Sequence, residues 1–211
     1  MLKTQTPSIH NFLSVAIKEI NIDSNREELL KRVAAKMVEE ITSNNKVSLN
    51  FICTHNSRRS QISQTWGFYI ANILNLPVQC LSGGTEVTAF HRNSVNTLKD
   101  AGFKFNITEF SHQNPVYEIE AKGVNEKLVG FSKTYDHYIN QNPYIAITTC
   151  NSADQNCPFI PEAIARFHVP YIDPKYADNT EEQDEAYMKT NKIIAAELNF
   201  LFSEVKNRLN R

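Results

Sequence analysis

An apolar segment that ends at a cysteine constrains the fold of this chain more than any other feature. Val47–Cys53 reads VSLNFIC, alternates as a strand does, and leads into the polar run Cys53–Ser60. From Ser60 to about Leu74, apolar residues recur on one helical face, at Ile62, Trp66, Ile70 and Ile73. A strand, a short loop and a helix in this order are typical of an α/β fold.

Strands and helices alternate along the rest of the chain. The pattern predicts strands at Pro77–Ser82, Tyr144–Cys150 and near Phe167–Tyr171, and helices at about Asn93–Ala101 and Glu181–Val205. Residues 1–45 look helical, and we expect them to form an extension packed on a catalytic domain at 46–211. Two short alternating runs around Gly123 predict an inserted β-hairpin at about 115–133. The order of elements favours an α/β sandwich with a mainly parallel sheet.

The overall charge and hydropathy exclude several classes of partner. A net charge of −1 over 211 residues creates no global field for nucleic acid or an anionic membrane. The chain has no apolar run of the roughly 20 residues that a membrane span needs. Its start lacks the continuous apolar core of a signal peptide. We therefore expect a cytoplasmic protein with no nucleic-acid or membrane partner, in which any anion site is local.

The loop after the first strand has the form C-x5-R-S, with the sequence CTHNSRRS. A short loop that enters a helix directs backbone N–H groups inward, which creates an anion cradle at the helix N-terminus. The positive environment favours the thiolate of Cys53, and the Ser60 hydroxyl is placed to hydrogen-bond it or to cap the helix. The expected cradle comprises Thr54, His55, Asn56, Ser57, Arg58 and Arg59.

This spacing predicts that Cys53 attacks a bound tetrahedral oxyanion, phosphate-like or arsenate-like. Arg59 is expected to close the cradle with a fork on two oxygens. An alternative interpretation is a buried cysteine followed by two surface arginines.

The segment CTHNSRRSQISQTWG resembles the phosphate-binding loop and first helix of the low-molecular-weight protein tyrosine phosphatases. It resembles still more their relatives, the thioredoxin-coupled arsenate reductases. The resemblance covers most of residues 47–205 and implies a three-layer α/β sandwich with a four-stranded parallel sheet. Asp173-Pro174 resembles the Asp-Pro loop of the family, which implies that Asp173 is the general acid. An ordinary turn is the alternative for this dipeptide.

A second pair of cysteines favours a reductase. The segment from Cys150 to Pro158 resembles the redox loop of the arsenate reductases, which runs Cys, six residues, Cys-Pro. Cys150 would attack Cys53 once it holds arsenic, and Cys157 would pass the disulfide to a thioredoxin-like reductant. The alternatives are a core residue at Cys150 with an incidental thiol at Cys157, or a zinc site, for which the spacing is wrong.

No metal or cofactor is expected. Gln64 stands where some reductases use a glutamate to hold potassium, and the remaining histidines show no paired metal spacing. Cys80, inside a predicted strand, is expected to be inert and buried. His55 replaces the usual loop glycine and would be strained if that position needs a positive φ.

The sequence therefore predicts an arsenate reductase that uses Cys53, Arg59, Ser60, Asp173 and the two relay cysteines. Thr54 and Ser57 are polar where tyrosine phosphatases place apolar residues, which also favours the reductase. The main alternative is a low-molecular-weight phosphatase that hydrolyses phosphate esters through a phosphocysteine. Tyr176 favours this alternative, because it follows Asp173-Pro174 closely, where phosphatases of the family carry aromatic residues that flank a phosphotyrosine. A third is a non-catalytic module that binds an anion or a partner.

Overall fold

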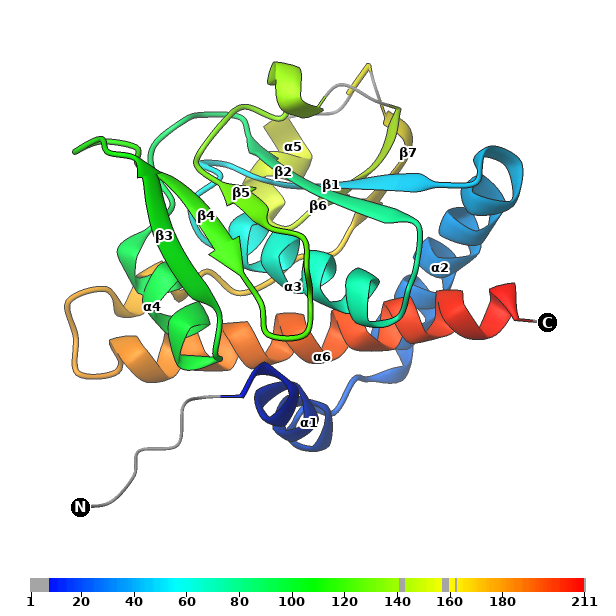
Figure 1. The fold of residues 1–211 in the computed structure, drawn as a ribbon, viewed down its shortest axis with the longest axis horizontal. Helices are drawn as coiled ribbons and strands as arrows, with labels where there is room; N and C mark the ends of the chain where they lie inside the picture. Colours follow the sequence, from blue (N-terminus) through cyan, green and yellow to red (C-terminus); the bar gives the residue numbers. More distant parts are fainter. Residues whose placement is uncertain (1–7, 141–142, 157–159, 162, 211) are drawn as a thin grey trace.

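A computed structural model describes residues 8–140, 143–156, 160–161 and 163–210. Its centre is a four-stranded parallel sheet in the order β2-β1-β6-β7 (Figure 1). The strands are β1 (Val47–Cys53), β2 (Val78–Gly84), β6 (Tyr144–Thr148) and β7 (Ala163–His168). The α/β fold implied by the resemblance is confirmed. β7 begins earlier than the predicted strand near Phe167–Tyr171, because this edge strand is only partly buried and lacks a continuous apolar pattern.

Helices cover both faces of the sheet. Since successive side chains of a strand point to opposite faces, each central strand contributes to two apolar clusters. Leu49 and Phe51 belong to the main core, with α2 (Ser24–Asn44), α3 (Arg59–Ile73) and α6 (Gln183–Leu209). Ile52 and Ala146 belong to a second apolar cluster, shared with α5 (Asn151–Asn156). The near-continuous burial of β1 and β6 is typical of a parallel sheet packed on both sides.

The N-terminal extension forms two helices, α1 (Ile9–Glu19) and α2, both packed against α6 (Figure 1). The helical prediction for this region is correct, but the helix is interrupted before Ser24. Asp23 caps α2 there, since its carboxylate accepts a hydrogen bond from the N–H of Arg26 at 3.0 Å. Apolar residues of both helices join the main core, among them Leu13, Leu30, Val33 and Met37.

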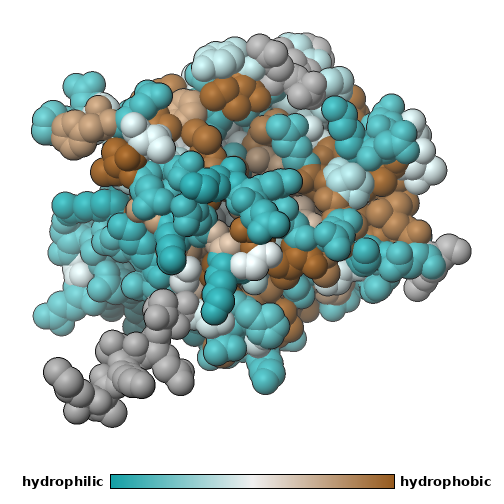
Figure 2. Space-filling model, in the orientation of Figure 1, coloured by the Kyte–Doolittle hydropathy of each residue, from teal (hydrophilic) through white to brown (hydrophobic). Residues whose placement is uncertain are grey.

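The insert is larger than the predicted hairpin. The hairpin itself is present as β4 (Val116–Glu120) and β5 (Leu128–Gly130), but β3 (Lys104–Glu109) adds a third antiparallel strand. β3 follows α4 (Arg92–Asp100), and its residues are almost all exposed, so it lacks the apolar pattern of a buried strand. Hydrophilic side chains cover this part of the molecule in Figure 2.

The described residues also form two 3-10 turns, η1 (Tyr138–Asn140) and η2 (Pro174–Ala177). Within the described ranges, no helix is both long and apolar enough to cross a membrane.

Candidate active site

Cys53 is the last residue of β1, and its thiol faces Ser60 in the first turn of α3. The Cys53 Sγ and Ser60 Oγ atoms are 3.0 Å apart, which is the contact expected from the sequence. The Asn56 side-chain Nδ2 donates to the same Ser60 oxygen at 2.9 Å. Because an amide nitrogen only donates, the Ser60 hydrogen remains available for the sulfur of Cys53. A hydroxyl that donates to sulfur stabilises the thiolate over the thiol.

Asn56, and not His55, takes the left-handed conformation in the loop. Its φ is 45°, and asparagine tolerates this region better than most residues, so the strain considered for His55 is absent. The Asn56 Oδ1 accepts hydrogen bonds from the Lys133 backbone N–H and the Gln61 Nε2, both at 3.0 Å. Asn56 therefore connects the loop, α3 and the segment after the insert. From the sequence, Asn56 is predicted only to be part of the cradle.

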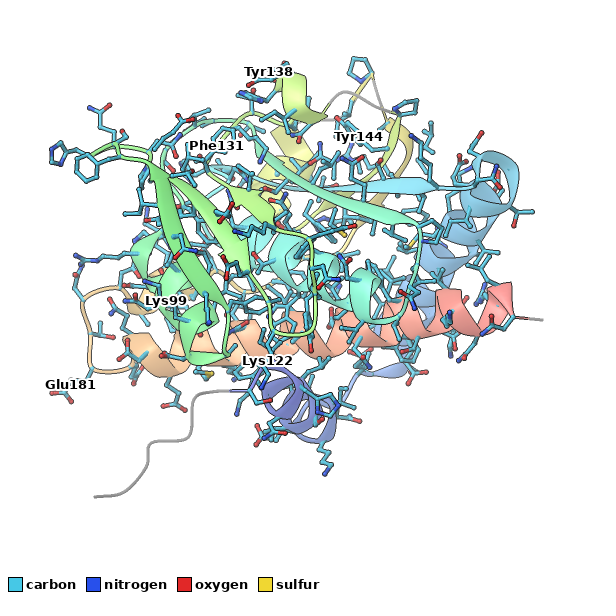
Figure 3. The ribbon with its side chains drawn as sticks, viewed as in Figure 1. Lys99, Lys122, Phe131, Tyr138, Tyr144 and Glu181 are labelled. Atoms are coloured by element: carbon cyan, nitrogen blue, oxygen red, sulfur yellow. The ribbon has the colours of Figure 1, made fainter. Side chains whose placement is uncertain are left out.

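Segment 131–133, directly after β5, supports the loop from the side of the insert (Figure 3). The Ser132 hydroxyl donates to the carbonyl of His55 at 2.8 Å. The Gln61 side chain on α3 donates to the carbonyl of Phe131 at 2.7 Å. These bonds fix the loop against α3 and against a segment that lies far away in the sequence.

Gly84, at the end of β2, allows the loop to approach the sheet closely. A Cβ atom at this position would lie 2.7 Å from both the Asn56 nitrogen and the Thr54 carbonyl oxygen. The backbone N–H of His91 donates to the carbonyl of Ser57 at 2.9 Å, which holds the other end of the loop. Backbone contacts therefore fix the loop in addition to the side-chain hydrogen bonds of Asn56, Gln61 and Ser132.

Arg59, the first residue of α3, is paired with Asp173. Its Nη2 lies 2.5 Å from the Asp173 Oδ2, and its Nη1 donates to the carbonyl of Tyr171 at 3.0 Å. Its Nε is buried and has no partner among the residues that the structure describes. The guanidinium is therefore oriented by the Asp173 segment, and one of its N–H donors is left without a protein acceptor in the described part of the chain.

Arg58 points to a different group of residues. Its Nη2 lies 2.7 Å from the Asp178 Oδ2, and its Nε donates to the Tyr187 hydroxyl at 2.6 Å. Burial raises the pKa of Tyr187 to about 12. Burial, together with the charge of Arg58, lowers the pKa of His91, which stacks on Tyr187. The charge of Arg58 is thus compensated by Asp178, and a contribution of this side chain to the cradle stays a prediction.

Cys150 lies two residues after β6 and faces the loop of Cys53. Its Sγ is 3.5 Å from the Thr54 Oγ1, and the N–H of Ala153 donates to it at 3.4 Å. The polar loop predicted after Cys150 begins instead with the helix α5, which this sulfur caps. Cys157, the second predicted relay thiol, lies outside the described residues.

Three of the predicted residues border one cavity. Arg59, Cys150 and Asp173 line a hollow of about 520 Å³, together with Asn151, Ser152, Pro170, Tyr171 and Ile172. The hollow lies at the carboxyl ends of the parallel strands, where ligands bind in α/β sheets. We call it the mouth. Tyr176 is exposed on η2 and does not line it.

Cys80 and Gln64 lie in the core beneath the loop. Burial raises the pKa of the Cys80 thiol, so this cysteine stays protonated. The Gln64 side chain donates to the carbonyl of Cys80 and accepts from the Ser82 hydroxyl at 2.6 Å. Across the described part of the chain, no group of three or more His, Cys, Asp or Glu residues is placed to hold a metal ion.

Comparison with known proteins finds relatives that are named arsenate reductases. No family model matches the chain. Arsenate reductase 2 of Staphylococcus epidermidis is 28% identical over 129 residues, which cover 61% of this chain and 79% of the relative. Arsenate reductase of Bacillus subtilis is 28% identical over 145 residues, which cover 69% and 86%.

Solved structures share the fold at lower identity. A mutant of YwlE from Bacillus subtilis superposes with a TM-score of 0.53 at 14% identity, over 79% of this chain and all of that one. A low-molecular-weight phosphotyrosine phosphatase from Vibrio cholerae O395 superposes with a TM-score of 0.50 at 12% identity, over 78% and 99%. The resemblance stated from the sequence is confirmed: this chain is similar in sequence to the arsenate reductases and has the fold of the low-molecular-weight protein tyrosine phosphatases.

Proposed function

We propose that this protein is an arsenate reductase that uses a thiol relay and a thioredoxin-like reductant. One observation carries the proposal: a second thiol, Cys150, shares the mouth with Arg59 and Asp173 and contacts the loop of Cys53. Hydrolysis of a phosphate ester needs no second thiol. The names of the sequence relatives support the same activity.

The first step forms an arsenic–sulfur bond. The Cys53 thiolate, stabilised by the Ser60 hydroxyl, attacks the arsenic of bound arsenate, and one arsenic–oxygen bond breaks. Asp173 donates a proton to the departing oxygen, which leaves as water. The Arg59 Nε and the loop N–H groups bind the remaining oxygens.

The second step transfers two electrons to arsenic. The Cys150 thiolate attacks the sulfur of Cys53, and the electrons of the arsenic–sulfur bond stay with arsenic, so arsenite leaves. A Cys53–Cys150 disulfide remains. Cys157 then attacks Cys150, which frees Cys53 and leaves a Cys150–Cys157 disulfide for an external dithiol to reduce. A cytoplasmic setting, as expected from the sequence, would supply such a dithiol.

Substitution of each relay thiol tests this proposal. We expect Cys150→Ser and Cys157→Ser to abolish multiple turnover of arsenate to arsenite, measured with thioredoxin, thioredoxin reductase and NADPH. Hydrolysis of an aryl phosphate should change little, because Cys53, Arg59 and Asp173 remain. Cys80→Ala is the matched control, since this buried thiol lies outside the relay. Full reductase turnover in both serine variants, or phosphate release without any arsenite from the unmodified protein, would contradict the proposal.

A further inference from the structure

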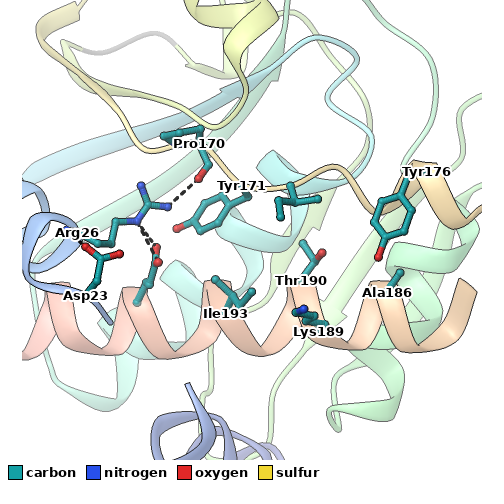
Figure 4. A pocket seen from close by; sticks show the side chains of 11 residues that line it. Asp23, Arg26, Pro170, Tyr171, Tyr176, Ala186, Lys189, Thr190 and Ile193 are labelled. Carbon is teal, nitrogen blue, oxygen red and sulfur yellow. Dashed lines mark hydrogen bonds and ion pairs between the residues drawn. The ribbon is translucent and has the colours of Figure 1, made fainter. Parts of the chain in front are cut away.

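Arg26, in the N-terminal extension, reaches the backbone beside the mouth. Its Nη2 donates to the carbonyl of Pro170 at 2.8 Å, and its Nε lies 3.0 Å from each carboxylate oxygen of Glu197 on α6 (Figure 4). The guanidinium carbon is 5.1 Å from the centre of the Tyr171 ring. The side chain is only 15% exposed, so these contacts are largely shielded from water.

Two arginines donate hydrogen bonds to the backbone carbonyls of Pro170 and Tyr171. Arg26 holds the carbonyl of Pro170, and Arg59 holds the next carbonyl, that of Tyr171. Two residues further along, Asp173 pairs with the same Arg59 guanidinium. The position of this short segment therefore sets the direction of the Arg59 fork.

This segment is a wall between two hollows. On one side lies the mouth; on the other lies a cavity of about 330 Å³, bordered by α2, α6 and η2 (Figure 4). Pro170, Tyr171 and Ile172 line both. On the side of the sheet, the Tyr171 N–H donates to the carbonyl of Thr149 at 3.1 Å. On the outer side, Arg26 holds the carbonyl of Pro170, next to the cavity.

We propose that Arg26 is a positioning residue for the oxyanion site. It fixes the Pro170–Tyr171 backbone, which in turn orients Arg59 and Asp173 toward the substrate. The role rests on the proposed function, because Arg59 and Asp173 are its targets. It gives the N-terminal extension a part in catalysis without any contact with the substrate.

The test compares variants of Arg26 with two matched controls. Arg26→Ala removes the contact, and Arg26→Lys keeps the charge for Glu197 but lacks the fork that reaches Pro170 at the same time. Glu197→Gln removes the charge of the ion pair but keeps a side-chain oxygen that can accept from Arg26 and from Tyr171, which also hydrogen-bonds Glu197. Arg32→Ala removes an exposed arginine from the same helix. One readout is the concentration of inorganic phosphate that protects Cys53 from iodoacetamide, followed by peptide mass spectrometry. The other is arsenite release.

We expect the half-protecting phosphate concentration to rise about tenfold in Arg26→Ala, with a similar loss of arsenite release, because small misplacements of a site are costly. Arg26→Lys should remain folded and should show a several-fold loss both in phosphate protection of Cys53 and in arsenite release. Millimolar guanidinium should restore phosphate protection in Arg26→Ala and change nothing in Arg32→Ala. Both control variants should stay within about twofold of the unmodified protein.

Two outcomes would overturn the positioning role of Arg26, and a third would overturn the proposed function itself. If phosphate protects Cys53 equally in the unmodified protein and in folded Arg26→Lys and Arg26→Ala, the positioning role is wrong. The same holds if Glu197→Gln loses as much as Arg26→Ala, since the effect then comes from the ion pair. If phosphate fails to protect Cys53 in the unmodified protein, the proposed function fails, and the role of Arg26 falls with it.

Discussion

At the scale of single residues, Lys133 is the least expected group near the site. Its side chain is 2% exposed, and among the described residues no carboxylate pairs with it. The Nζ lies 3.5 Å from the Ser82 hydroxyl and 4.8 Å from the centre of the Phe131 ring. Burial lowers its pKa to about 8. An ammonium held in this way destabilises the fold, while the backbone of Lys133 supports Asn56.

We expect Lys133→Met to stabilise the protein at pH 7 by on the order of 3 kcal/mol. Since the pKa of the folded lysine lies below its unfolded value, the folded state binds fewer protons between about pH 8 and 10.5. The cost is therefore fully present below pH 8 and disappears as the pH rises toward 10.5. Urea unfolding of both proteins from pH 7 to 10 measures this. A stability difference that stays constant with pH would show that the amine is not the cause.

At the scale of elements, α5 determines where Cys150 lies. This helix begins directly after Cys150 and is attached to the sheet through Asp154. The Asp154 Oδ1 accepts hydrogen bonds from the Thr148 hydroxyl at 2.8 Å and from the Arg166 guanidinium at 2.6 Å. Burial raises the pKa of Asp154, but these two hydrogen bonds and the charges of His168 and Arg166 together lower it below its ordinary value. The carboxylate thus joins the helix to β6 and β7.

We expect Asp154→Ala to slow formation of the Cys53–Cys150 disulfide by on the order of tenfold, because the second thiol is no longer held beside the loop. The measurement is oxidation by diamide in a Cys157→Ser background, with the disulfide peptide counted by mass spectrometry. Asp100→Ala, an exposed change at the end of α4, serves as the control. Equal rates in the two variants would show that Asp154 has no part in placing Cys150.

At the scale of the whole molecule, α6 unites the extension with the sheet. It packs against α1, α2, α3 and α4 (Figure 1). The Trp66 indole donates to the Asn191 side chain at 2.6 Å, and Phe12 from α1 stacks on the same indole. We infer that residues 8–44 and the catalytic domain unfold as one unit.

Leu30→Ala tests this inference. We expect a loss of about 3 kcal/mol, because Leu30 is fully buried between the extension and the main core. Calorimetry should show one transition at a lower Tm. Val15→Ala, at a position 42% exposed, should leave the Tm almost unchanged. Two transitions, with only one moved by Leu30→Ala, would mean that the extension is a separate unit.

The strand, loop and helix around Cys53 were predictable from the sequence, and so was the contact of its thiol with Ser60. Their residues are close in sequence, and local periodicity and spacing carry that information. The β4–β5 hairpin was predictable for the same reason. β3 was not, because an exposed strand depends on its neighbour for pairing and needs no apolar pattern of its own.

What only the tertiary structure decided is how distant segments meet at the mouth. Arg59 pairs with Asp173, which is 114 positions away, and Arg26 holds a carbonyl 144 positions away. Asn56 connects the loop to the segment after the insert, because the backbone N–H of Lys133, far away in the sequence, donates to its side chain. The sequence by itself determined the loop after Cys53 and the alternation that builds the sheet. The packing of α2 and α6 against the Pro170–Asp173 segment determined the direction of Arg59. These contacts link residues far apart in the sequence, and local sequence patterns carry no information about them.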